Sequence, residues 1–238
     1  MATEPKQGSI FPKLKNIKLS SMKSLKKIWN SEPPSDSFRK LDTLIIEECD
    51  KLVIAFPFYI EGIFHNLCNL RVTNCRSMQA IFDIHVKVGD VSNLQDVHLE
   101  TLPKLKHVWK LNEDRLGILK WNNLQKICVQ DCYSLENIFP FSVANCLDNL
   151  EYLEVGQCFE LREIVAKSEA ANTDEVSFHF PKLSTIKLSV LPRLTSLYGG
   201  PGAYDLSCPT LNDLSIEFCD KLEPFHKNEQ RKPLFPEE

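Results

Sequence analysis

Nine cysteines are the residues of this chain best suited to chemistry. A thiol can bind metal, act as a redox group or nucleophile, or form half of a disulfide. The stretch VQDCYSLENIFP at 129–140 holds Cys132 next to an acidic residue, with Cys128 four positions upstream. Their C-x-x-x-C spacing differs from the short pairing that we expect of a zinc site. The choice among the other roles depends on how the chain places its remaining cysteines.

Histidines and glycines add no catalytic arrangement. The six histidines are scattered along the chain and form no H-E-x-x-H motif, and no Ser/His/Asp or Cys/His set can be assembled from their spacing. The glycine-rich stretch YGGPGAY at 198–204 lacks the Lys and Ser/Thr of a phosphate-binding loop. The sequence therefore predicts a protein that is not an enzyme, with no cofactor and no metal.

Composition and charge narrow the classes of partner. The net charge is −4 with both signs interspersed, which gives no electrostatic argument for binding nucleic acid. No apolar run reaches the roughly 18 residues of a membrane span, and the N-terminus lacks the apolar core of a secretory signal. We expect a cytoplasmic protein with reduced cysteines. We interpret the lysine-rich stretch 13–27 as a solvated face at an N-terminal edge, with attraction to an anion or membrane as the alternative.

Most of the cysteines belong to an internal repeat. Counted from Cys132, apolar residues stand at −11, −8, −5, −3, +3, +6 and +7, and this frame fits eight places spaced 26 to 33 residues apart. Their central residues, the anchors, are Met22, Cys49, Cys75, Leu102, Cys132, Cys158, Leu191 and Cys219. Because three anchors are Met or Leu, the position favours a buried apolar group, a role that free cysteine fills well. Cys128, at −4, is then the thiol expected to be exposed.

The repeat also predicts the fold. The L-x-x-L-x-L part of each copy alternates apolar and polar residues, as a half-buried strand does, and only stacked copies can bury such a face. Frame and length match the leucine-rich repeat. We predict an α/β solenoid, a horseshoe of about eight repeats with a parallel concave sheet and an irregular or short-helical convex side. Residues 1–10 form an N-terminal extension, 11–226 the repeat domain and 227–238 a tail.

The segments that return from one strand to the next are predicted as loops, single turns or short helices. Residues 141–150 are the best helical candidate. Extra residues accumulate at 110–120 and 166–176, and we expect both segments to be convex-side or lateral loops.

Three copies carry a family resemblance: LIIEECDKLVIAFP (44–57), ICVQDCYSLENIFP (127–140) and LETLPKLKHVW (99–109). With their neighbours, over residues 11–226, they resemble the leucine-rich-repeat region of plant intracellular disease-resistance receptors, which join a coiled coil and a nucleotide-binding module to C-terminal repeats. The resemblance implies a role in defence against pathogens. The chain has no P-loop motif. We therefore expect either the sensor part of a receptor, whose N-terminal edge would face the nucleotide-binding module, or a free-standing repeat protein.

Positions −6, −4 and −2 point outward from the predicted concave sheet, and no two repeats agree there. Core positions share one constraint, whereas outward positions are free to serve a partner. Aromatic and arginine side chains dominate binding energy at interfaces. The candidate partner-binding residues are Ile45, Arg71, His98, Lys126, Tyr152, Glu154 and Lys187. The alternative is a hydrophilic strip that contacts nothing.

These predictions describe a non-catalytic protein-recognition module in plant defence. Its partner would be a pathogen effector, a guarded host protein or a nucleotide-binding module in the same or another chain. The alternatives are a substrate-recruiting leucine-rich-repeat subunit of a ubiquitin ligase and a generic interaction scaffold. The absence of an F-box-like helical segment before residue 11 argues against the ligase subunit.

Overall fold

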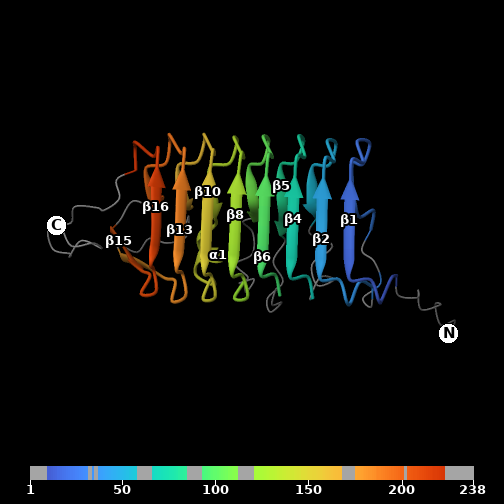
Figure 1. Ribbon diagram of the computed structural model, residues 1–238, viewed down its shortest axis with the longest axis horizontal. Helices are drawn as coiled ribbons and strands as arrows, with labels where there is room; N and C mark the ends of the chain where they lie inside the picture. The colour runs from blue at the N-terminus through green and yellow to red at the C-terminus, as the bar shows by residue number, and fades with distance from the viewer. Residues whose placement is uncertain are drawn as a thin grey trace, which may run out of the picture.

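Eight strands form one parallel sheet in the computed structural model, which describes residues 10–31, 34, 37–57, 66–84, 93–111, 121–167, 175–200 and 203–222 (Figure 1). Each of these eight strands has five residues and ends two residues before the anchor of its repeat. In sheet order they are β1 (Asn16–Ser20), β2 (Thr43–Glu47), β4 (Asn69–Thr73), β6 (Asp96–Glu100), β8 (Lys126–Gln130), β10 (Tyr152–Gly156), β13 (Thr185–Ser189) and β16 (Asp213–Glu217). The predicted solenoid of stacked repeats is confirmed.

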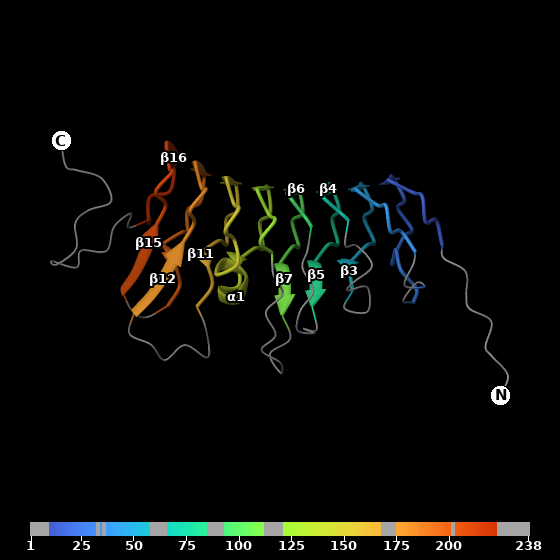
Figure 2. The ribbon, with the colours of Figure 1, turned by 90° about the horizontal axis from the view of Figure 1, so that it is seen from below.

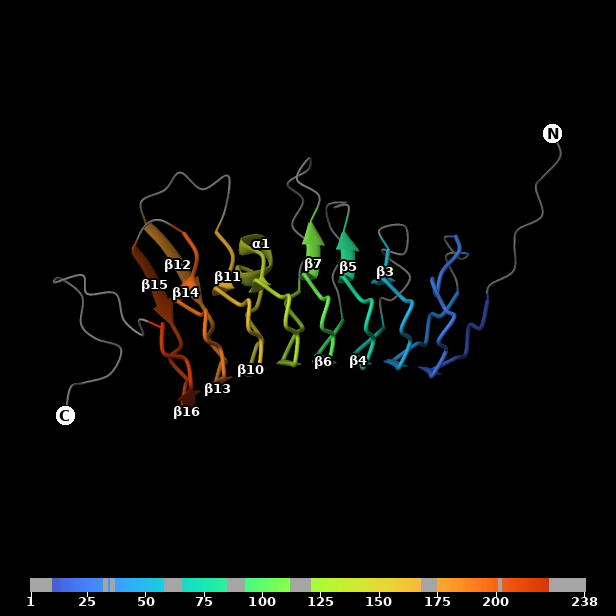
Figure 3. The same ribbon diagram turned by 90° about the horizontal axis from the view of Figure 1, so that it is seen from above.

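Alternation along each strand separates core from surface. In β2, Leu44 and Ile46 are fully buried while the intervening Ile45 is half-buried on the other face. All eight strands pair in register, so each outward position lies beside the same position of the next repeat. The sheet curves shallowly, with its outward face on the inner side of the curve (Figure 3).

The anchor cysteines have a structural role that leucine cannot share. The Sγ atoms of Cys75, Cys132 and Cys158 lie 3.4, 3.4 and 3.3 Å from the carbonyl oxygen two residues earlier, the last of the strand. Each thiol therefore fills the core and donates a weak hydrogen bond at the strand end. Burial raises the pKa of the Cys75 thiol to about 11, as expected for a core residue.

Met22 is the exception among the anchors, because it is 43% exposed. At the other end of the sheet, the inward residues Leu214 and Ile216 of β16 are also exposed. Within the described residues, β1 and β16 each have a neighbouring strand on one side only, so their core positions are covered on one side only.

A left-handed residue precedes every anchor. The eight residues have φ between 52° and 56°: Ser21, Glu48, Asn74, Thr101, Asp131, Gln157, Val190 and Phe218. The backbone N–H of Asn74, for example, donates to the carbonyl of Glu100 at 3.0 Å, which extends the sheet ladder into the turn. None of the eight is glycine, so no residue type marks this turn in the sequence.

Val190 is the most strained of these residues, because a β-branched side chain fits the left-handed region poorly. The third repeat uses Asn74 at the same place, and asparagine tolerates this conformation. We expect Val190→Asn to raise the free energy of unfolding by about 0.5–1 kcal/mol. Chemical denaturation measures the change, and Asn74→Val should shift stability in the opposite direction.

The convex side differs from the prediction, because most return segments are short strands (Figure 2). One sheet contains β3 (Ile54–Phe56), β5 (Ala80–Ile84) and β7 (His107–Leu111), and a second contains β9 (Asn137–Phe139), β11 (Glu163–Val165) and β14 (Ser196–Tyr198). A third pairs β12 (Glu175–His179) with β15 (Ala203–Ser207). The runs are rich in β-branched and aromatic residues and meet the same run of the next repeat in register.

The predicted helix at 141–150 is confined to one turn, α1 (Phe141–Ala144). Of the two predicted loops, residues 110–111 instead end β7 and residues 175–176 begin β12. Residues 166–167 form no helix or strand, and residues 112–120 and 168–174 lie outside the described part. The glycine-rich stretch joins β14 to β15, and its residues 201–202 also lie outside the described part.

Aromatic side chains at position +7 stack through the middle repeats. Ring centroids are 5.0 Å apart for Phe56 and Phe82, 6.1 Å for Phe82 and Trp109, and 5.4 Å for Trp109 and Phe139, with interplanar angles of 20°, 19° and 29°. Trp121 packs edge-on against Trp109 at 5.4 Å. This column ties four successive repeats together behind the sheet.

Candidate protein-binding face

The candidate residues all lie on the outward face of the eight-stranded sheet, here called the concave face, towards which Figure 1 looks. Register places Ile45, Arg71, His98, Glu154 and Lys187 in the central row, at −4. Lys126 and Tyr152 lie side by side at −6. The structure separates these seven residues into two groups.

The first group surrounds Tyr152. Its hydroxyl donates a hydrogen bond to Glu154 Oε2 at 2.6 Å, and this bond raises the pKa of the Tyr152 phenol. Lys126 Nζ lies 4.8 Å from the ring centroid and Lys187 Nζ lies 5.9 Å from it, so ammonium groups from both neighbouring strands approach the ring. Tyr152 is thus held in one orientation before any partner arrives.

Gln130 completes this arrangement. Its Nε2 donates to Glu154 Oε1 at 3.1 Å, so Glu154 accepts from two side chains at once. Gln130 lies close over Gly156, where an added Cβ would stand 2.2 Å from its Oε1 atom. Because Gly156 has no side chain, the Gln130 side chain has room to lie over it. We call Lys126, Gln130, Tyr152, Glu154 and Lys187 the Tyr152 cluster.

The second group lies in the second, third and fourth repeats. Glu100 Oε2 is 3.8 Å from Arg71 and 3.1 Å from His98 Nε2. Ile45 sits in the same row beside Arg71, half-buried. Among the described residues, no side-chain hydrogen bond or ion pair joins these three candidates to the Tyr152 cluster, although β6 and β8 are adjacent and place Glu100 beside Gln130. The seven candidates therefore lie on one continuous face, and their role in binding stays a prediction.

The expectation that Cys128 is the exposed thiol is wrong. Its side chain is buried, with 7% of the residue exposed, although it occupies an outward position. Its neighbours in the row are His98 and Glu154, whose longer side chains cover the short thiol. Glu154 Oε2 lies 3.9 Å from the Cys128 sulfur. Burial, with the nearby carboxylate as a smaller cause, raises the Cys128 pKa to about 11.

Cys128 should consequently resist labelling despite its place on the surface sheet. With its pKa raised to about 11, Cys128 is mostly protonated near pH 8, and the thiolate is the reactive form. We expect its alkylation rate to rise about tenfold per pH unit up to about pH 11. Mass spectrometry of peptides labelled at several pH values tests this, and rapid labelling at neutral pH would contradict it.

Two further residues that could contact a partner were not among the candidates predicted from the sequence. Tyr133 and Phe159, one residue after the anchors of repeats five and six, are 38% and 42% exposed and stack at 5.0 Å with an interplanar angle of 3°. The Tyr133 hydroxyl donates to Asp131 Oδ1 at 3.1 Å. The other exposed large apolar side chains of the described part lie in the first and last repeats or just before the first: Ile10, Phe11, Met22, Leu214, Ile216 and Phe218. We call Tyr133 and Phe159 the rim pair.

A comparison of position +1 among repeats would have found the rim pair. The other six repeats have a charged residue or proline there: Lys23, Asp50, Arg76, Pro103, Pro192 and Asp220. Repeats five and six also supply most of the Tyr152 cluster. The rim pair and most of the Tyr152 cluster thus fall in the same two repeats.

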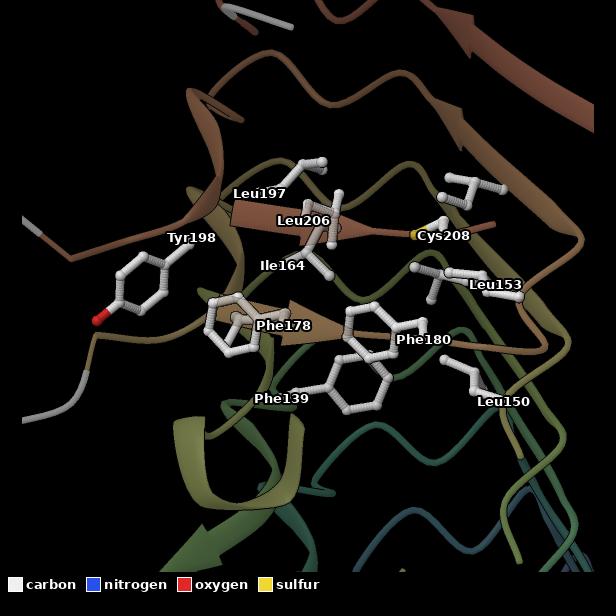
Figure 4. A pocket seen from close by; sticks show the side chains of 13 residues that line it. Phe139, Leu150, Leu153, Ile164, Phe178, Phe180, Leu197, Tyr198, Leu206 and Cys208 are labelled. Atoms are coloured by element: carbon white, nitrogen blue, oxygen red, sulfur yellow. The ribbon is translucent and has the colours of Figure 1, made fainter. Parts of the chain in front are cut away.

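A small apolar cavity of about 40 Å³ lies near repeats six to eight (Figure 4). Apolar side chains line it, and the Tyr198 hydroxyl points away from it. Cys208 lies on its wall at −11, where Phe38, Trp121 and Phe180 fill the core of other repeats. The cavity is accordingly a packing gap left by a small residue.

Among the described residues, no group of three or more His, Cys, Asp or Glu side chains is arranged to hold a metal ion. No helix in the described part is long and apolar enough to cross a membrane.

Comparison with known proteins identifies the repeat. The family model described as plant disease resistance protein RPS2-like, leucine-rich repeats, matches residues 13–159 and 145–227. Among curated Arabidopsis thaliana proteins, the probable disease resistance protein At4g14610 is 28% identical over 179 residues, covering 67% of this chain and 24% of its own length. Disease resistance protein RPS5 is 24% identical over 233 residues, covering 86% of this chain and 24% of its own length.

No solved structure matches the chain. The chain spans about a quarter of the length of these two relatives. Because the family model covers nearly all of the stacked repeats described above, the chain belongs to the RPS2-like leucine-rich repeats of plant disease resistance proteins.

Proposed function

We propose that this chain is a non-catalytic recognition module in plant defence and that it binds a protein through repeats five and six. The partner is a pathogen effector, a guarded host protein or a nucleotide-binding module of a receptor, met in the cytoplasm. The observation that carries the proposal is the joint presence of the Tyr152 cluster and the rim pair on these repeats.

The Tyr152 cluster has the properties of an interface centre. Tyrosine offers a large contact area at a small cost in side-chain entropy, and here the Glu154 hydrogen bond has already fixed its ring. Lys126 and Lys187 add positive charge that acidic groups of a partner can match. The outward strand positions of all eight repeats together hold four basic and six acidic residues, so the whole face gives no strong long-range attraction for a partner of either charge. Affinity would therefore come from local complementarity.

The rim pair extends this surface past the strand ends. Seven residues separate position −6 from position +1, which corresponds to about 20 Å along the repeat. A standard interface buries about 800 Å² on each partner, a patch of similar width. The Tyr152 cluster and the rim pair therefore fit within one footprint, whereas Ile45, Arg71 and His98 lie in repeats two to four.

Quantitative pull-down from leaf extract tests the proposal. Lys126→Glu/Lys187→Glu reverses two charges of the Tyr152 cluster, and Lys18→Glu reverses one on the same face in the first repeat. We expect a protein that wild-type and Lys18→Glu baits capture equally and that the double variant loses by at least about tenfold. Equal capture by all three baits, or enrichment of no protein over bare resin, would contradict the assignment.

A further inference from the structure

A hollow of about 600 Å³ opens over β3, on the return segments behind the sheet. The neighbouring repeats supply its two sides, with Lys26 and Lys27 from the first and Ser77 and Asp83 from the third. Ligand sites in proteins commonly measure about 300–1,000 Å³, are mostly apolar and carry a few polar groups. This hollow has that size and that composition.

The local fold explains why the hollow exists. The convex sheet that contains β3 begins at this strand, which has three residues, whereas β5 has five. The described residues of the first repeat's return segment form no strand. Pro57 follows β3 and cannot donate a ladder hydrogen bond. The first-repeat chain therefore runs beside β3 without pairing to it.

The apolar wall of the hollow is well ordered. Trp29 is buried, its indole Nε1 donates to the Ala55 carbonyl at 3.1 Å, and its ring packs edge-on against Phe38 at 5.4 Å. Ile28, Val53, Ile54 and Pro57 are half-buried along the same lining, so each leaves apolar surface open to a ligand. The wall resembles a preformed site more than an accidental gap between flexible side chains.

The charge of the hollow is one-sided. Lys26, Lys27 and Lys51 line it, and no ion pair among the described residues includes any of them, in contrast to Lys18, Lys110 and Lys187. The one carboxylate in the lining, Asp83, lies 3.4 Å from Lys110. Three ammonium groups thus line an apolar wall without forming an ion pair within the described part of the protein.

We propose that this hollow is a binding site for a small amphipathic anion, meaning a carboxylate, sulfonate or phosphate carried on an apolar or aromatic body. The lysines would contact the anionic group as point charges, and Ile54 and Trp29 would contact the apolar body. The site lies behind the sheet in repeats one to three, apart from the Tyr152 cluster. It is therefore independent of the proposed protein-binding function.

The probe is 8-anilinonaphthalene-1-sulfonate, an aromatic sulfonate whose fluorescence rises on binding. We expect one saturable site on the full chain. Lys26→Ala/Lys51→Ala should raise the dissociation constant of the probe by about tenfold or more, and added salt should raise it for the wild-type protein. The matched control, Lys104→Ala/Lys182→Ala, removes two exposed lysines outside the hollow and should leave binding unchanged.

Circular dichroism confirms that both double variants keep the wild-type fold, which their exposed positions lead us to expect. A second arm separates charge from apolar contact: decanoate should displace the probe, whereas inorganic phosphate at equal concentration should not. Absence of saturable binding, or equal weakening in both double variants, would overturn the site. Displacement by phosphate as effective as by decanoate would overturn the role of the apolar wall.

Discussion

Replacing Trp109 by alanine is expected to lower the free energy of unfolding by about 3–5 kcal/mol. Trp109 is 2% exposed and stacks between Phe82 and Phe139, so its loss opens the aromatic column in the middle of the solenoid. Each repeat contacts only its neighbours, and stability along a solenoid depends on those interfaces. The cavity would therefore weaken the coupling between the two halves as well as the fourth repeat itself.

Urea denaturation followed by circular dichroism measures this effect. Trp109→Phe keeps a ring in the column and should cost less than half as much as alanine, and Tyr133→Ala, on the exposed rim, should cost at most about 1 kcal/mol. The broken column should also separate the unfolding of the two halves into two transitions. A loss below 1 kcal/mol for Trp109→Ala would show that the column does not hold the repeats together.

Tyr152→Ala is expected to weaken binding of the protein partner by about 30- to 1,000-fold, the range of an interface hot spot of about 2–4 kcal/mol. The substitution removes the ring between Lys126 and Lys187 and leaves Glu154 with Gln130 as its remaining cluster donor. Because Tyr152 is half-buried on the concave face, protein stability should change by no more than about 1 kcal/mol.

Tyr152→Phe is the matched control, because it keeps the ring and removes the hydrogen bond to Glu154. It should weaken binding by a smaller factor than alanine, through loss of the fixed ring orientation. Calorimetric titration with the captured partner gives all three affinities. A Tyr152→Ala affinity within about threefold of wild type would remove Tyr152 from the interface.

The strand positions could be predicted from the sequence because burial acts on them directly. Leu44 and Ile46 are apolar because they face the core, and the same constraint recurs in every repeat. The left-handed turn before each anchor could not be predicted from residue types. The turn requires a particular backbone conformation, and residues as different as Asn74 and Val190 adopt it. The convex strands were missed because each forms only by pairing with the next repeat.

The candidate binding surface could also be predicted only in part. The repeat frame alone sufficed to place Tyr152 and Lys187 on the concave face, because alternation fixes which side chains point outward. It could not show that Cys128 would be covered, since that depends on the lengths of the neighbouring side chains. Nor could it join Tyr152 to Glu154, because the rotamers that form their hydrogen bond have no signature in the sequence.

Hydroxyl-radical footprinting of the partner complex tests the central claim most directly, because it locates the partner on the surface by the side chains it shields. If repeats five and six form the interface, oxidation of Tyr133, Tyr152 and Phe159 should fall at least about fivefold on binding, as expected for side chains at the centre of an interface. Oxidation of Met22 and Phe218, exposed in the first and last repeats, should stay unchanged. Shielding of Met22 or Phe218 with no shielding of Tyr152 and the rim pair would contradict the account.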